Sequence, residues 1–222
     1  MKKIRRGQKG FTLLEIIVVL AVIGALAAML APVVFRYIDD AKRAQAQSDT
    51  NTIASAIQQM YKDTGRWPFY KDGVGALKLA ATDAVVLSSN EACGAALITT
   101  AAADITAPAV GDSGMPTTTS LCDSLANQLI KNLPKFAGTP YKTDGARAWR
   151  GPYLERIPAL DPWGRSYLVN IGNADPSAET FATQKWVVAI SAGPDGILQT
   201  VVSVLANSNQ QVVGDDVVAR VK

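Results

Sequence analysis

Hydrophobic positions run almost without a break from Leu13 to Phe35, and this run dominates the pattern of the chain. Between Phe11 and Phe35 the only charged residue is Glu15, and fifteen of these 25 residues are Leu, Ile, Val or Phe. A helix of that length rises about 37 Å, enough for a hydrocarbon core of about 30 Å. Each such residue favours insertion by about 0.3 to 0.6 kcal/mol, and a central acid opposes it by about 2.5 to 3.5 kcal/mol. The pattern therefore predicts a membrane-spanning helix.

After Phe35 the pattern becomes amphipathic. Hydrophobic residues recur at the i, i+4, i+7 and i+8 spacing of one helix face, at Ile53, Ile57, Met60 and Tyr61. The opposite side is mostly polar, with Ser48, Asp49, Asn51, Gln58 and Gln59. The two patterns follow one another without a turn signal. We therefore expect one helix of about 50 residues, with an apolar first half and an amphipathic second half.

A proline and a glycine indicate where this helix should bend and where it should end. Pro32 lacks an amide hydrogen and clashes with the preceding turn, so we expect a kink or an opened turn there. Gly65, followed by Pro68, is a suitable end for the helix.

The C-terminal third has the composition of short strands separated by turns. The strand-like segments are SYLVNI, KWVVAISAG, TVVSVL, QQVVGDD and VVARVK, at 166–171, 185–193, 200–205, 210–216 and 217–222. The DPWG segment at 161–164 predicts a turn, and we expect Trp163 within it to pack on the core. Three or more antiparallel strands would have one face to bury, and the amphipathic helix face is its natural cover. The expected fold is α+β, with a long N-terminal helix on a small C-terminal antiparallel sheet.

The middle of the chain, roughly residues 76–120, is rich in Ala and Thr and reads as an insertion. Its segments LKLAATDAVVL and ACGAALITTAAADI, at 77–87 and 92–105, have the composition of short helices. Two cysteines, Cys93 and Cys122, permit one disulfide closing a loop of about thirty residues. Two unpaired thiols are the alternative, and an oxidising compartment favours the bridge.

Charge is concentrated at the N-terminus. The first ten residues carry five of the 22 basic residues and no acid, which leaves 17 basic against 19 acidic residues elsewhere. No dispersed basic face suggests nucleic-acid binding. Positive charge is retained on the cytoplasmic side of membranes, so we expect residues 36–222 outside the cytoplasm.

The sequence offers little for catalysis. It contains no histidine, which removes the commonest general base, and none of the common hydrolase, zinc or redox motifs. A Ser–Lys pair stays open, but the remaining acids are more simply solvated or turn residues, among them Asp39, Asp40, Asp83, Asp104, Asp161 and Asp175.

The N-terminal residues KGFTLLE, with the basic leader before them and the apolar helix after them, resemble the type IV pilin family. The resemblance implies that a prepilin peptidase cuts between Gly10 and Phe11 and methylates the new terminus on Phe11. Glu15 then matches the family's acid at the fifth mature position, while Gly24 and Pro32 stand where helix-loosening residues are common. The implied parts are a leader (1–10), a transmembrane and filament-core helix (11–35), an amphipathic helix (36–66), a variable region (67–150) and a sheet with a C-terminal loop (151–222).

Cleavage gives a physical reason for the acid in the apolar helix. The new amine on Phe11 is positive, and a carboxylate in a low-dielectric setting needs an opposite charge. In a stack of parallel helices Glu15 of one subunit can meet the Phe11 amine of the next, which would fix the axial register. The alternative is an acid that snorkels to the membrane interface.

The motifs GPYL, IP, DPWGRSY, SAGPDG and GDD resemble, more narrowly, the major pseudopilin of type II secretion systems. The resemblance implies a calcium ion in the C-terminal loop, held by acidic side chains and backbone carbonyls. The matching positions are Asp195, Asp215 and Asp216, with carbonyls near Ser191 and Gly193. Nearly twenty residues separate Asp195 from Asp215, longer than the subgroup's pattern, so a plain turn and a solvated loop are the alternative.

The favoured function is a structural, non-enzymatic subunit of a periplasmic pseudopilus that helps drive proteins across the outer membrane. The implied partners are further copies of the chain, minor pseudopilins, an inner-membrane assembly platform, the prepilin peptidase and, indirectly, an assembly ATPase. The implied location is the bacterial inner membrane, crossed once. A type IV pilus subunit is the alternative within the family, and a membrane-tethered extracytoplasmic enzyme is the distant one.

Overall fold

The computed structural model describes residues 11–68, 85–89, 121–134, 140–171, 187–200, 212 and 214–221. Its elements, in order, are helix α1 (Leu13–Thr64), strands β1 (Val85–Ser88) and β2 (Leu121–Ser124), π-helix η1 (Asn127–Lys131), and strands β3 (Leu168–Asn170), β4 (Val188–Ser191) and β5 (Val217–Arg220). The chain divides into two compact units, Met1–Ala41 and Lys42–Lys222, and α1 contributes to both.

α1 is continuous over 52 residues, as the sequence predicts. Residues on both sides of Pro32 belong to the same continuous helix, so the proline does not open a turn. The helix ends at Thr64, and Gly65 follows with a φ of 69° while its amide donates to the carbonyl of Tyr61. The predicted stop at Gly65 is confirmed, and the left-handed backbone explains why glycine stands there.

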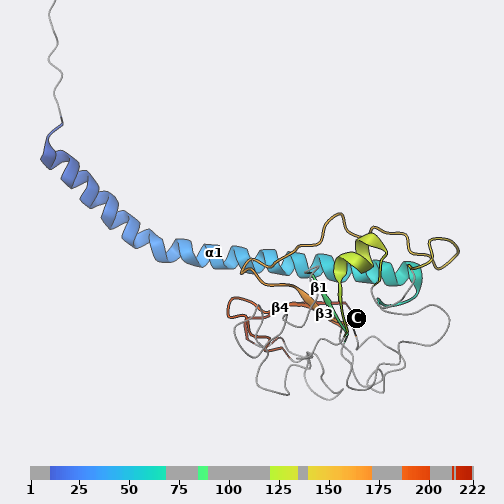
Figure 1. Ribbon diagram of the computed structural model, residues 1–222. Helices are drawn as coiled ribbons and strands as arrows, with labels where there is room; N and C mark the ends of the chain where they lie inside the picture. Colours follow the sequence, from blue (N-terminus) through green and yellow to red (C-terminus); the bar gives the residue numbers. More distant parts are fainter. Residues whose placement is uncertain are drawn as a thin grey trace, which may run out of the picture. The chain divides into compact units, whose positions relative to one another are not determined.

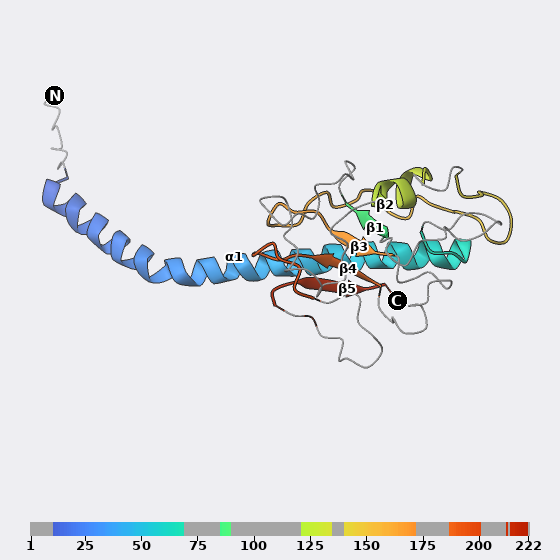
Figure 2. The same cartoon turned by 60° about the horizontal axis from the view of Figure 1, so that its bottom comes forward.

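The sheet lies in the second unit and has the order β2-β1-β3-β4-β5, which Figure 2 shows side by side. β1 pairs with β2 in parallel, with Val85 opposite Leu121, and the β1–β3, β3–β4 and β4–β5 pairs are antiparallel. The predicted α+β class is confirmed, but the sheet is mixed rather than purely antiparallel. Two of its five strands also come from before residue 151, outside the expected C-terminal sheet.

The expected helix at 77–87 is wrong at its C-terminal end. Residues 85–88 form strand β1 in the structure, where the β-branched pair Val85–Val86 suits an extended backbone next to β3. Residues 69–84 and 90–120, with the other expected helix, lie outside the described residues. So do the strand candidate at 201–205 and most of 210–213. Strands β3, β4 and β5 fall within three of the predicted segments and confirm them.

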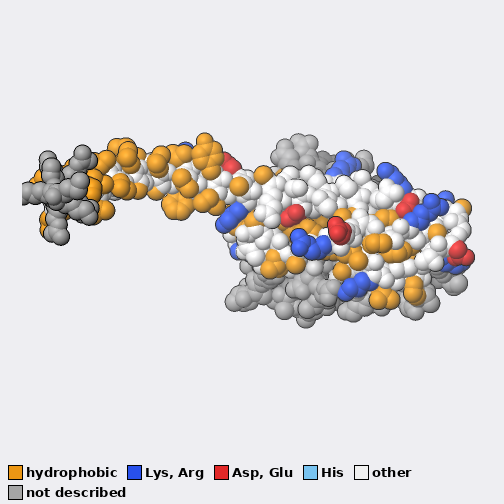
Figure 3. Space-filling model, turned by 90° about the horizontal axis from the view of Figure 1, so that it is seen from above, with side chains coloured by type: hydrophobic (Ala, Val, Ile, Leu, Met, Phe, Trp, Pro, Cys, Tyr) orange, Lys and Arg blue, Asp and Glu red, His pale blue; other side chains and the backbone are white. Residues whose placement is uncertain are grey.

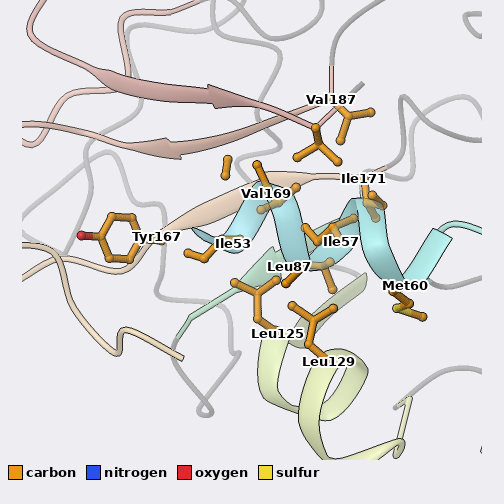
Figure 4. Close-up of a cluster of buried hydrophobic side chains, with 14 of the residues drawn as sticks. Ile53, Ile57, Met60, Leu87, Leu125, Leu129, Tyr167, Val169, Ile171 and Val187 are labelled. Atoms are coloured by element: carbon orange, nitrogen blue, oxygen red, sulfur yellow. The ribbon is translucent and has the colours of Figure 1, made fainter. Parts of the chain in front are cut away.

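The C-terminal half of α1 supplies one wall of the core (Figure 1). Ile53, Ile57 and Met60 are fully buried, and Figure 4 shows Ile53 and Ile57 among side chains from the sheet and from the segment leading into η1. The other labelled members of this cluster are Leu87, Leu125, Leu129, Tyr167, Val169, Ile171 and Val187. At about 25 cal/mol for each Å² of apolar surface removed from water, this shared cluster is the main source of stability of the second unit.

Two aromatic expectations are wrong. Tyr61 is 39% exposed rather than buried, and its ring stacks on Trp67 with centroids 4.1 Å apart. Trp163 is only half-buried and lies outside the core cluster. Trp67 and Trp149 pack on the core instead.

Candidate functional site

The start of α1 is a capped helix terminus. The hydroxyl and the carbonyl of Thr12 both accept from the Glu15 amide, at 3.2 Å and 3.1 Å. Thr12 is therefore the N-cap, and Glu15 lies in the first helical turn, where the helix dipole favours a negative charge. Both Glu15 and Phe11 are exposed, Phe11 at 79%. Gly10 and the rest of the leader lie outside the described residues.

The first half of α1 leaves its hydrophobic side chains uncovered. One 18-residue window has a mean hydropathy of 2.8 and none of it is buried. Figure 3 shows hydrophobic side chains covering this segment of the helix. Side chains such as Leu20, Leu26 and Phe35 are 56–66% exposed. By length and composition, α1 is the one helix in the described part of the chain that is able to cross a membrane.

The second predicted site is built on two turns that approach closely in space. One turn spans 193–196 after β4, and the other spans 214–215 before β5. A Cβ on Gly193 would lie 2.4 Å from the carbonyl oxygen of Asp215, so only glycine allows this approach. The Asp195 amide donates to Asp215 Oδ2 at 3.1 Å. The structure thus brings Asp195 and Asp215 together, despite the long segment between them.

A glutamine holds the two turns in place. Gln199 donates through Nε2 to Asp195 Oδ2 at 2.8 Å and accepts from the Asp215 amide through Oε1 at 3.2 Å. The backbone amide of Gln199 donates to Asp216 Oδ2 at 2.8 Å. Gly214 leaves the space for this side chain, since a Cβ there would lie 1.0 Å from Gln199 Oε1. No sequence pattern singles out Gln199, because a lone amide in a loop carries no motif.

The carboxylates of this loop are electrostatically strained. Partial burial raises the pKa of Asp195, and the neighbouring Asp215 charge raises it further. Burial is also the main cause that raises the pKa of Asp216, which is 6% exposed. Two buried oxygens, Asp215 Oδ1 and Asp216 Oδ1, accept no hydrogen bond from any of the described residues. An extra cation would relieve each of these penalties.

The three acids do not by themselves form a metal centre. Within the described part of the chain no group of three or more His, Cys, Asp or Glu side chains is gathered closely enough to hold a metal. Calcium takes six to eight oxygen ligands, so most would have to be carbonyls or water. The two unpartnered carboxylate oxygens fit a hard cation, but the side chains supply only part of its coordination.

A third turn supports the acidic loop. The Gly164 amide donates to the Asp161 carbonyl at 2.9 Å, which confirms the predicted DPWG turn. Asp161 is 5% exposed rather than solvated, and its carboxylate accepts from the amides of Trp163 and Arg165 and from the Ser191 hydroxyl. Arg165 in turn donates to the carbonyl of Gly193 at 2.9 Å. The DPWGR and SAGPDG segments are therefore one hydrogen-bonded structure, which their separation in sequence concealed.

The cysteine prediction falls mostly outside the described residues. Cys122 belongs to β2, opposite Val86 of β1, and Cys93 is not among the residues described. The disulfide therefore stays a prediction.

Comparison with known proteins gives matches to one group of relatives. The prokaryotic N-terminal methylation motif matches residues 5–31. The chain is 41% identical over 73 residues to type II secretion system core protein G of Pseudomonas aeruginosa, covering 33% of this chain and 51% of the relative. The protein of the same name from Klebsiella michiganensis is 38% identical over 73 residues, with the same shares. Toxin coregulated pilin of Vibrio cholerae is 36% identical over 75 residues, or 34% of each chain.

These matches are partial. The chain covers about half the length of the core protein G relatives, and no solved structure matches it significantly. The motif nevertheless covers part of the predicted leader, the predicted cleavage position and the first part of the exposed apolar helix. The chain carries the N-terminal methylation motif of type IV pilins, and a third of its length is homologous to core protein G of type II secretion systems and to toxin coregulated pilin.

Proposed function

We propose that this chain is the structural subunit of a pseudopilus, a short filament that helps drive protein secretion across the outer membrane. The observation that carries the proposal is a methylation motif over 5–31 that overlaps a helix whose apolar side chains are exposed in the described structure. Such a surface is stable in lipid or against other copies of the same helix. The subunit acts by assembling, without chemistry of its own.

Three residues at the start of the mature chain have separate roles. Gly10 marks the cleavage site, and Phe11 carries the new methylated amine. The Glu15 carboxylate pairs with the Phe11 amine of the neighbouring subunit, and this pair sets the axial register of the helices. Its position in the first turn of α1 supports this role, because the helix terminus supplies only about half a positive charge and leaves the carboxylate short of a full counter-ion.

The proposed location follows from the leader. Its five positive charges keep the N-terminus in the cytoplasm and residues 36–222 in the periplasm, with one crossing of the inner membrane. The partners are other copies of the chain, minor pseudopilins, the assembly platform and the prepilin peptidase. A periplasmic domain also favours a disulfide between Cys93 and Cys122.

The proposal is tested by deleting the gene and measuring secreted hydrolases and surface pili in parallel. Loss of secretion with pili retained supports the pseudopilus. Loss of pili with secretion retained supports the alternative, a type IV pilus subunit. The similarity to toxin coregulated pilin is the reason to test this alternative.

Complementation tests the register mechanism. The Glu15→Ala variant should insert in the membrane and be processed normally but form no filaments, while Glu15→Asp should recover part of the assembly. Glu155→Ala removes an equivalent exposed carboxylate from the second unit and serves as the matched control. Normal filaments from Glu15→Ala would refute the role of this carboxylate.

We also propose that the loop around Asp195, Asp215 and Asp216 binds calcium. The support is the pair of buried oxygens that have no hydrogen-bond partner among the described residues, together with the raised pKa of Asp195 and Asp216. Bound calcium would supply positive charge and link the turns before β5 and after β4. Calcium should raise the midpoint of thermal unfolding and a chelator should reverse the rise, since only the folded chain gathers these ligands.

The calcium shift should be lost in Asp215→Asn and kept in Asp144→Asn, which changes an exposed acid in another loop. Equal midpoints with calcium and with chelator in the unchanged chain would remove the calcium proposal and leave the filament proposal intact.

A further inference from the structure

The two turns that carry the acids meet because strands β4 and β5 are neighbours in the sheet. Figure 2 shows the two strands side by side, and Ser191, the last residue of β4, pairs with Val217, the first residue of β5. The turn after β4 and the turn before β5 therefore lie at the same end of this strand pair. The acids on these turns are joined by a residue that belongs to neither turn, Gln199.

Gln199 forms a hydrogen bond with each of the three acids of the proposed calcium site. Its Nε2 donates to the Asp195 carboxylate, its Oε1 accepts from the Asp215 amide, and its backbone amide donates to the Asp216 carboxylate. A glutamine amide carries a donor and an acceptor without a charge, so it can join a carboxylate of one turn to a backbone amide of the other. Both polar ends of the side chain are engaged in this way, which suits a residue that orients ligands.

Hydrogen bonds also decide which carboxylate oxygens stay open. Asp216 Oδ2 accepts from the backbone amides of Gln199 and Thr200, while Asp216 Oδ1 has no partner among the described residues. Asp215 Oδ2 accepts from the Asp195 amide, and Asp215 Oδ1 likewise has no partner in the described part of the chain. One oxygen of each carboxylate is therefore held by backbone amides, and the other is buried where a cation would relieve its desolvation.

The neutrality of this side chain matters as well as its hydrogen bonds. The Asp215 charge repels that of Asp195, and the guanidinium of Arg165, which donates to the Gly193 carbonyl, offsets only part of this repulsion. A lysine or arginine at position 199 would neutralise the acids itself, and a glutamate would add a further repulsion. The amide holds the acids together and leaves their negative charge for a cation.

We propose that Gln199 is a positioning residue for calcium, which joins the two turns and so orients the open oxygens of Asp215 and Asp216 before the cation binds. This role depends on the calcium site proposed above. It explains how that site forms across the long segment between Asp195 and Asp215. Replacing a group that orients metal ligands through hydrogen bonds lowers metal affinity by about tenfold to hundredfold.

The test measures calcium binding to the full chain in detergent by isothermal titration calorimetry, at constant ionic strength and well below the unfolding midpoint. Gln199→Ala removes both side-chain bonds and keeps the backbone amide that holds Asp216. We expect its calcium dissociation constant to rise about tenfold to hundredfold. The matched control is Gln58→Ala, which removes a glutamine that donates to the Val221 carbonyl, beyond the other end of β5. This control should lower the unfolding midpoint without changing the calcium affinity.

A second variant displaces the same side chain without replacing it. A Cβ on Gly214 would lie 1.0 Å from Gln199 Oε1, so Gly214→Ala should also weaken calcium binding. Gly145 has a positive φ too, but no atom of the described residues lies within 4 Å of its Cβ position, so Gly145→Ala should leave the affinity unchanged. If Gly214→Ala acts through Gln199, adding it to Gln199→Ala should weaken binding less than it does in the unchanged chain. The two glycine variants carry the test if Gln199→Ala does not fold.

The calcium site and the role of Gln199 can fail separately. If the unchanged chain binds no calcium saturably, the calcium site itself is wrong, and the role of Gln199 is wrong with it. Calcium binding as tight in Gln199→Ala as in the unchanged chain would overturn the role of Gln199 and leave the calcium site intact. Equal weakening by Gln58→Ala would also overturn that role, because the loss would then come from a general loosening of the sheet.

Discussion

Replacement of Asp161 by alanine tests whether the turn at 161–165 and the loop at 193–196 are one structure. The Asp161 carboxylate is 5% exposed and accepts from Arg165 N at 2.8 Å, Trp163 N at 3.0 Å and Ser191 Oγ at 2.6 Å. Alanine would leave all three donors without this acceptor. Hydrogen bonds to a charged group contribute about 1.5 to 3 kcal/mol each.

The net loss must be smaller than the sum of these bonds. Removing a buried carboxylate relieves its desolvation cost, and water entering the space left behind can accept from some of the donors. We therefore expect the free energy of unfolding to fall by about 3 kcal/mol. For a unit of this size the midpoint of thermal unfolding should fall by about 6 to 12 °C.

The assay is thermal and urea unfolding of the purified chain in detergent, followed by circular dichroism. Asp161→Asn keeps one carbonyl oxygen for the two backbone amides and should lose about 1 kcal/mol. Ser191→Ala should lose a similar amount, and combining it with Asp161→Ala should cost less than the sum, because both changes remove the same bond. A change below about 0.5 kcal/mol for Asp161→Ala would refute the reasoning, since that is the effect of an ordinary surface substitution.

Three further changes probe other parts of the second unit. Ile57→Ala empties a fully buried site in the core and should cost about 2 to 5 kcal/mol in urea unfolding, and a loss below 1 kcal/mol would mean that this helix face is not packed as described. Gly214→Ala should destabilise the protein more than Gly145→Ala. Both glycines have a positive φ, but only at Gly214 would the new Cβ meet a neighbouring side chain, that of Gln199. Equal losses of stability would contradict this crowding. Burial chiefly raises the pKa of Tyr153, so its phenol should titrate later than free tyrosine in ultraviolet absorbance. Because the unfolded chain ionises first, stability should fall as the pH rises above about 10, and less so in Tyr153→Phe.

The sequence was sufficient to predict the fold where a hydrophobic period extends over many residues. The 52-residue helix, its end before Gly65 and its buried face at Ile53, Ile57 and Met60 follow from spacing alone. Tyr61 was misplaced because a residue eight positions after Ile53 lies at the edge of the stripe, where packing on Trp67 decides its exposure.

Short segments and long-range strand pairing could not be predicted from the sequence. Three apolar residues and a serine at 85–88 have no period that separates strand from helix, and only pairing with β3 and β2 makes them a strand. The parallel β1–β2 pair joins residues 36 positions apart, which no local pattern encodes. The acidic loop was found by motif, but Gln199 and Arg165, which hold it together, were not, because a single polar side chain becomes informative only when its partners are known.

Strand β5 is the last strand of the sheet, so one of its edges has no neighbouring strand in the described structure. Gln47 of α1 donates to the Val218 carbonyl on this strand at 3.1 Å, and Gln58 donates to the Val221 carbonyl just after it at 3.0 Å. Arg220 adds an exposed charge to the same strand. An open edge invites unplanned strand pairing between molecules, and occupied carbonyls with a charge discourage it. A chain proposed to assemble through its helices would thus protect its sheet from pairing between copies, and crowded copies would stay available for ordered assembly.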